Sequence, residues 1–138
     1  IARAAVEARI SRLIEQLPAG YDTPVRRRGA LFSPGERQRI AIARALLRDG
    51  RVWLLDEPTA GLDRELSAQL VEMLLERTRG RTTLWATHDP DVIPRLDRVL
   101  VLAKGRVEFF GDPREYARRS HPVGQKLDAV SVPQLLEG

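Results

Sequence analysis

Cysteine is absent from this chain of 138 residues. Disulfide frameworks, zinc sites built on thiolates and catalysis by a thiol are therefore excluded. Lysine is nearly as scarce, because only Lys104 and Lys126 accompany the arginines. A phosphate-binding P-loop needs a glycine-rich turn followed by Lys and then Ser or Thr. Gly105 follows the first lysine and Leu127 the second, so the chain contains no P-loop.

Long hydrophobic runs are also missing, since no apolar stretch approaches the roughly 20 residues of a membrane helix. The composition is 43% hydrophobic and 30% charged, which excludes a disordered tail and indicates one ordinary domain with its own core. No basic-then-apolar leader follows Ile1. We expect no signal peptide and a chain that begins within a longer gene product.

The net charge is +4 and the isoelectric point is about 10.3, values that could indicate a nucleic-acid partner. Acidic residues are interleaved with the arginines almost everywhere, which favours a mixed, solvated surface instead. The cluster Arg26–Arg28 stands apart from this pattern. We therefore expect no nucleic-acid partner.

The spacing of apolar residues predicts strands that alternate with helices, which is typical of an α/β fold with a largely parallel sheet. Two opening helices come without strands and predict a helical lobe. The run 52–55 is continuously apolar and predicts a strand buried on both faces, and 82–87 predicts another buried strand. The expected helices are 3–17, 33–49, 64–79 and 113–119, with a short helical turn near 91–96, and the remaining strands are 99–103 and 106–110.

Local signals mark several ends of these elements. Ser33, Pro34 and Glu36 have the spacing of a capping box with proline at the first helical position. Lys104 and Gly105 separate two strands as a two-residue hairpin turn. Asp112 is expected to cap the last helix.

Two carboxylates follow the first apolar strand directly. In an open α/β sheet, ligands bind at the carboxyl ends of the strands. Asp56 there could hold Mg²⁺, which prefers oxygen ligands, and Glu57 could act as general base toward a water. The alternative is a strand that simply ends in a polar turn.

Two further segments could meet a phosphate. His88 follows the strand 82–87, so it is expected at the same sheet edge, where a neutral imidazole can hydrogen-bond a γ-phosphate oxygen. The helix that begins after Ser33 presents free N–H groups to an anion, and Gly35 would let a phosphate approach its backbone. A satisfied histidine and an ordinary helix cap are the alternatives.

Together these segments resemble the ATP-binding cassette (ABC) ATPases. Order and spacing agree over about residues 17–111, and the resemblance is to the C-terminal half of the nucleotide-binding domain, with the P-loop (Walker A) half absent. The matching segments are Phe32–Glu36 (Phe-Ser-Pro-Gly-Glu, where the family carries the signature Leu-Ser-Gly-Gly-Gln) with its continuation Arg37–Leu46, Val52–Thr59 (Walker B and the catalytic glutamate), Ala60–Asp63 (the D-loop) and Ala86–Asp89 (the switch histidine).

The resemblance implies an enzyme that hydrolyses ATP with Mg²⁺. Asp56 would serve the metal, Glu57 the attacking water and His88 the γ-phosphate. The segment Ser33, Gly35 and Glu36 would cover ATP held by a second nucleotide-binding domain in a homo- or heterodimer, with Asp63 linking the two sites.

The lead-in Leu17–Thr23, with Val25 and Gly29, is similar to exporter-type cassettes and, more distantly, to thiol exporters of cytochrome bd assembly. This likeness implies a transmembrane domain as a partner, touched by the loop with the arginine cluster, and places this chain at the cytoplasmic face of the cell membrane. The expected division is a helical subdomain at 1–50, half of the ATPase core at 51–111 and a C-terminal extension at 112–138.

Two departures from the family pattern concern the signature. Pro34 replaces its first glycine and removes one N–H, and Glu36 replaces its glutamine, placing a carboxylate near a triphosphate. If Glu36 turns back as a capping-box partner, the repulsion is smaller.

Two other functions remain open from the sequence. Because the chain lacks a P-loop, it is expected to be inactive alone, and a truncated, non-catalytic cassette that serves as an interaction module is the first alternative. The high isoelectric point leaves a soluble ABC ATPase that acts on nucleic acid or the ribosome as the second.

Overall fold

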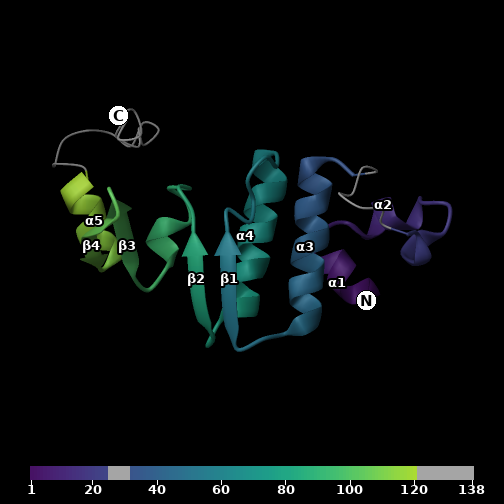
Figure 1. The fold of residues 1–138 in the computed structure, drawn as a ribbon, viewed down its shortest axis with the longest axis horizontal. Helices are drawn as coiled ribbons and strands as arrows, with labels where there is room; N and C mark the ends of the chain where they lie inside the picture. The colour runs from purple at the N-terminus through teal and green to yellow at the C-terminus, as the bar shows by residue number, and fades with distance from the viewer. Residues whose placement is uncertain (25–31, 121–138) are drawn as a thin grey trace. The chain divides into compact units, whose positions relative to one another are not determined.

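The computed structural model describes residues 1–24 and 32–120, and the chain divides into two compact units, Ile1–Ala86 and Thr87–Gly138 (Figure 1). The arginine cluster Arg26–Arg28 and the tail 121–138 lie outside the described residues. Within the described residues, no helix combines the length and the apolar character needed to cross a membrane.

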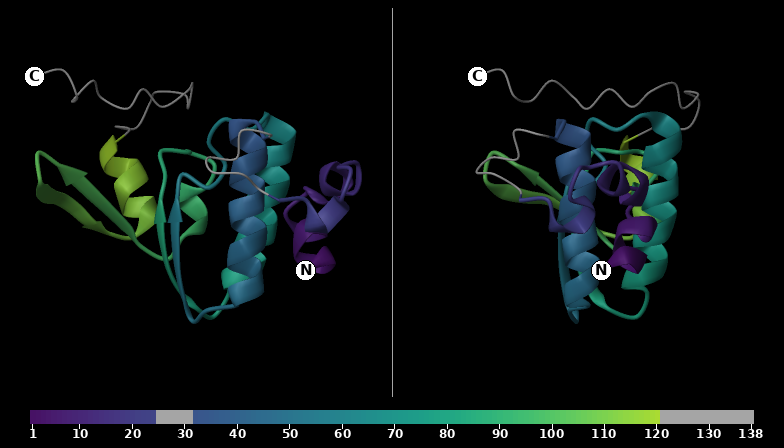
Figure 2. Two further views of the ribbon diagram at one scale, coloured as in Figure 1. Left: turned by 45° about the vertical axis from the view of Figure 1, so that its right-hand side comes forward. Right: turned by 90° about the vertical axis from the view of Figure 1, so that its right-hand side faces the viewer.

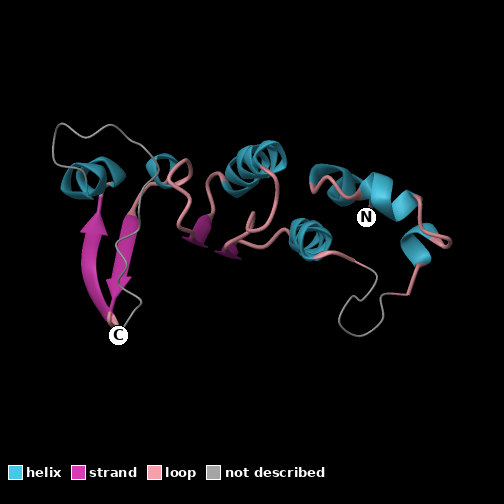
Figure 3. Ribbon diagram, turned by 90° about the horizontal axis from the view of Figure 1, so that it is seen from above, coloured by secondary structure: helices cyan, strands magenta, loops and turns pink. Residues whose placement is uncertain are grey.

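The first unit combines a parallel pair of strands with helices. Its strands pair in register from Val52 with Thr82 to Asp56 with Ala86, and the helix between them makes the crossover. Figure 3 shows α4 across one face of the strands and α3 beside β1. The elements are α1 (Ala2–Glu7), α2 (Ser11–Glu15), η1 (Gly20–Asp22), α3 (Pro34–Arg48), β1 (Val52–Asp56), α4 (Arg64–Thr78) and β2 (Thr82–Ala86).

The start of α3 confirms the predicted capping box. The Ser33 N–H donates to Glu36 Oε2 at 2.8 Å, and the Glu36 N–H donates to Ser33 Oγ at 3.3 Å. Pro34 occupies the first helical position, where its missing N–H would have no helical partner. The local sequence therefore sets where this helix begins.

The prediction of one helix over 3–17 is wrong, because the helix is interrupted after Glu7. Arg9 has a left-handed φ of 57°. Its N–H donates to Val6 O at 3.0 Å, and the Ile10 N–H donates to Ala5 O at 2.9 Å. These two bonds form a Schellman motif, which ends α1 without the usual glycine. The break places Ile10 in the core beside Ala5.

Only one face of the strand pair is covered in this unit. Trp53 and Leu55 are 5% and 8% exposed, whereas Val52 and Leu54 are 64% and 75% exposed. On the neighbouring strand, Leu84 is 62% exposed. The helices of this unit cover only one face of the strand pair. The prediction that 52–55 and 82–87 are buried strands is therefore correct for that face and wrong for the opposite face. The core holds Ala4, Ala5, Ala8, Ile10, Ile42, Leu46, Trp53, Leu55, Leu70 and Leu74.

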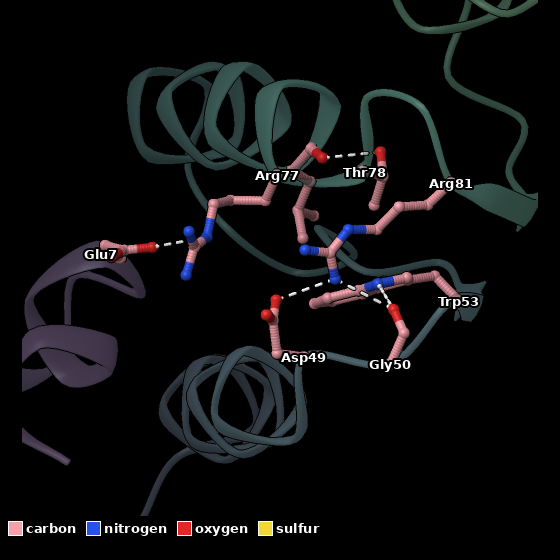
Figure 4. A network of polar contacts seen from close by, with 8 residues as sticks. Glu7, Asp49, Gly50, Trp53, Arg77, Thr78 and Arg81 are labelled. Carbon is pink, nitrogen blue, oxygen red and sulfur yellow. Dashed lines mark hydrogen bonds and ion pairs between the residues drawn. The ribbon is translucent and has the colours of Figure 1, made fainter.

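A polar network closes the amino ends of both strands (Figure 4). Arg81 pairs with Asp49 at 2.8 Å and donates to Gly50 O at 2.9 Å. The Trp53 Nε1–H donates to the same carbonyl at 2.9 Å. The hydrogen bond and charge of Arg81 lower the pKa of Asp49 below its usual range. The network thus joins the end of α3 to the start of each strand.

The second unit is a hairpin followed by a helix (Figure 2). It contains η3 (Ile93–Arg95), β3 (Val99–Ala103), β4 (Arg106–Gly111) and α5 (Pro113–Ser120). Lys104 and Gly105 have φ of 49° and 71°, as a type I′ turn requires, which confirms the predicted hairpin. Asp112 Oδ1 accepts from the Arg114 N–H at 2.7 Å and confirms the predicted cap. Phe109 packs against Tyr116, with ring centroids 5.6 Å apart.

The Asp49–Arg81 pair predicts a pH-dependent stability. Because folding lowers the pKa of Asp49, its carboxylate stabilises the fold above about pH 4, and this stabilisation is lost as the pH falls through the folded pKa. Asp49→Asn keeps the size and the left-handed backbone tolerance of the residue but removes the charge. We expect the variant to unfold at lower denaturant concentration at pH 7, with the difference shrinking below about pH 4.

Glu76→Gln is the matched control for this measurement. Glu76 pairs with Arg79 at 2.9 Å on the surface, with both side chains well exposed, and such pairs contribute little. The unfolding of Glu76→Gln should match that of the wild type at pH 7 and at pH 3. An Asp49→Asn deficit of equal size at pH 7 and pH 3 would contradict the role of the ion pair.

Candidate functional site

The two carboxylates of the predicted site lie at the carboxyl end of the parallel strand pair. Asp56 is the last residue of β1 and pairs with Ala86, the last residue of β2. Its side chain is exposed, and that of Glu57 is half-buried. This is the sheet edge at which open α/β folds bind their ligands.

Glu57 has an unusual backbone that the sequence analysis did not predict. Its φ is 42°, in the left-handed region that costs a non-glycine residue about 1–3 kcal/mol. Three hydrogen bonds hold it: its N–H donates to Ala86 O at 3.0 Å, and its carbonyl accepts from the Ala60 N–H at 3.1 Å and from Gln38 Nε2 at 3.2 Å. Surrounding structure therefore fixes the direction in which this residue leaves the strand.

The segment that resembles the signature is a closed helix cap. Both polar side chains of the box, Ser33 and Glu36, face each other's backbone N–H. Phe32 is buried just before the cap, and its carbonyl accepts from Arg37 Nη1 at 2.6 Å. The carboxylate of Glu36 is thus turned back toward its own helix, which is the arrangement expected to reduce repulsion of a phosphate.

Gly35 is closely packed against another segment of the chain, and a larger residue there would require the Leu62 side chain to shift. A Cβ added at Gly35 would lie 2.8 Å from Leu62 Cδ2 and 3.8 Å from Gly61 O. The first turn of α3 therefore rests directly on the loop between β1 and α4. The sequence suggested only a phosphate-related reason for this glycine, and no local pattern could have shown the contact with Leu62.

Asp63 has a structural function that the sequence analysis missed. Its side chain accepts from the Leu66 N–H at 2.9 Å and caps α4. An aspartate directly before a helical run of apolar residues is itself an N-cap signal and could have predicted this.

The predicted site residues do not all fall in one unit. Ser33, Gly35, Glu36, Asp56, Glu57 and Asp63 belong to the first unit. Gly35 contacts the loop that joins Glu57 to Asp63. His88 belongs to the second unit, one residue after Thr87, so its approach to the carboxylates stays a prediction.

Within the described residues, the donor set fits a cation that takes few protein ligands. Residues 1–24 and 32–120 contain no group of three or more His, Cys, Asp or Glu side chains able to hold a metal. Mg²⁺ commonly uses one or two carboxylates and completes its shell with water and substrate phosphates. A single exposed carboxylate, Asp56, is compatible with that mode and not with a cage made wholly of protein.

Comparisons with known proteins give one consistent family. The family model described as "ABC transporter" matches residues 2–60. The "Glutathione/L-cysteine transport system ATP-binding/permease protein CydD" of Bacillus subtilis is 43% identical over 115 residues, which cover 83% of this chain and 20% of the relative. An "ATP-dependent lipid A-core flippase" of Alkalilimnicola ehrlichii is 46% identical over 112 residues, covering 81% and 19%.

A solved structure agrees with these relatives. The structure titled "Structure of a bacterial Atm1-family ABC exporter with ATP bound" superposes with a TM-score of 0.79 and 36% identity, covering 87% of this chain and 21% of that one. The chain thus spans about a fifth of the length of the proteins it matches. These findings confirm the resemblance drawn from the sequence: the chain belongs to the ABC ATPases, and it matches the nucleotide-binding domain of an exporter.

Proposed function

We propose that this chain forms part of an ATP-hydrolysing domain that drives export across a membrane. The observation that carries the proposal is the pair Asp56 and Glu57 at the carboxyl end of a parallel strand pair, with the backbone of Glu57 fixed by three hydrogen bonds. The names of the relatives support it, since they describe an ATP-binding/permease protein, a flippase and an exporter with ATP bound.

Each carboxylate has its own part in the proposed reaction. Asp56 would hold Mg²⁺, which when bound offsets the charge of the phosphates. Glu57 would accept a proton from the water that attacks the γ-phosphorus, and its restrained backbone would keep the carboxylate in place for that transfer. His88 would donate a hydrogen bond to a γ-phosphate oxygen.

A second nucleotide-binding domain would complete the proposed ATP-binding sites. Ser33, Gly35 and Glu36 form a helix start that would cover the ATP of that partner, because the positive end of a helix favours anions. Asp63 would connect the two sites from the adjoining loop. A transmembrane domain is the other proposed partner, which would place this chain at the cytoplasmic face of the membrane. The division of the chain at residues 50 and 111 remains a prediction.

The isolated chain is predicted not to bind ATP tightly, because it contains no P-loop to surround the phosphates with N–H groups and a lysine. Titration calorimetry of the 138-residue chain with Mg-ATP should show no saturable binding at micromolar concentration. A low-micromolar dissociation constant would contradict the prediction.

Glu57→Gln in the intact transporter that contains this chain tests the proposed catalysis. The change keeps the size and hydrogen-bonding capacity of the side chain but removes the base, so kcat for ATP should fall about 10²–10⁴-fold while ATP still binds. Glu65→Gln, an exposed change on α4, is the matched control and should leave kcat within twofold of wild type. Full turnover in Glu57→Gln would favour a non-catalytic module.

The two departures in the signature, Pro34 and Glu36, predict that restoring the residues of the family pattern raises ATP turnover. The double variant Pro34→Gly with Glu36→Gln restores one N–H donor and removes a carboxylate, and glutamine can still close the capping box. We expect turnover at the site that this segment covers to rise about three- to tenfold, provided that the partner cassette is intact. Unchanged or reduced turnover would show that the Ser-Pro-Gly-Glu sequence is already fully competent.

A further inference from the structure

We infer that Gln38 is a positioning residue for Glu57, and this inference rests on the proposed function of Glu57 as the base. Gln38 lies in α3, and its half-buried side chain reaches across to the loop that follows β1. The amide Nε2 donates to the Glu57 carbonyl at 3.2 Å, joining residues 19 positions apart in the sequence.

The conformation of Glu57 needs this external support. The ring of Pro58 pushes the preceding residue toward extended backbone, yet Glu57 has a φ of 42°. The Glu57 carbonyl accepts from both the Gln38 amide and the Ala60 N–H, so removal of the Gln38 amide takes away one of the donors that hold this carbonyl. The Glu57 backbone could then relax from its left-handed φ toward the extended region, and this change in φ would redirect the carboxylate.

A second contact joins the same helix to the same loop. Gly35 lies three positions before Gln38, on the same side of α3, and its Cα faces the side chain of Leu62. The loop is therefore held at both ends, by a hydrogen bond at residue 57 and by close packing at residue 62. The helix whose start is proposed to cover a partner's ATP thus sets the position of the base at this chain's own site.

Gln38→Met in the intact transporter is the primary test. Methionine matches the length of glutamine but has no N–H to donate. We expect kcat for ATP to fall about fivefold, with the KM for ATP within twofold of wild type, because a hydrogen bond that orients the base is lost while nucleotide contacts remain. Gln38→Asn, which keeps the amide on a shorter side chain, should show a similar loss of kcat. For every variant, kcat is normalised to the amount of folded transporter.

Gln69→Met is the matched control. Gln69 lies on α4, where its amide donates to Glu65 Oε1 at 3.3 Å on the surface. This variant removes an amide of the same kind without touching the loop and should leave both kcat and KM within twofold of wild type.

A double variant separates positioning from general structural support. If Gln38 acts through Glu57, adding Gln38→Met to Glu57→Gln should change the residual turnover less than twofold. A fivefold further loss in that background would overturn the inference, as would wild-type kcat in Gln38→Met and Gln38→Asn when Glu57→Gln is inactive. Wild-type kcat in Glu57→Gln would instead refute the proposed function, and the inference with it.

Discussion

Burial of one face of β1 against the helices of the first unit is the constraint on which the candidate site depends. Trp53 and Leu55 enter the core, and their neighbours in the strand consequently point the other way. Because side chains alternate along a strand, this packing fixes the rotation of β1 and hence the place at which Asp56 leaves the sheet. The network around Arg81 holds the opposite end of the strand, so β1 is anchored along its whole length.

Several residues proposed to act on nucleotide are also structural. Glu36 and Asp63 each satisfy a backbone N–H at the start of a helix, and such caps contribute about 1 kcal/mol. Gly35 leaves room for Leu62. Substituting any of these residues therefore changes stability as well as chemistry, and measurements on them need a count of folded protein. Glu57 differs, because hydrogen bonds to its backbone N–H and carbonyl hold it in place.

Local signals in the sequence predicted several elements correctly. The spacing of Ser33, Pro34 and Glu36 places every atom of the capping box within one helical turn. The hairpin turn at Lys104 and Gly105 likewise depends only on adjacent residues. The motifs that resemble ABC ATPases are short and contiguous, so the family could be identified without coordinates, and the comparisons confirm it.

The sequence by itself determined the family, the starts of α3, α4 and α5, the hairpin and the carboxylates at the end of β1, because each follows from residues within a few positions of one another. Tertiary structure decided the break at Arg9, where burial of Ile10 outweighs continuation of the helix. It also decided the left-handed backbone of Glu57 and the hydrogen bond from Gln38, and it left the second face of β1 uncovered. The contact between Gln38 and Glu57 forms only when α3 lies beside β1, and no local sequence pattern predicts contacts between segments so far apart in the chain.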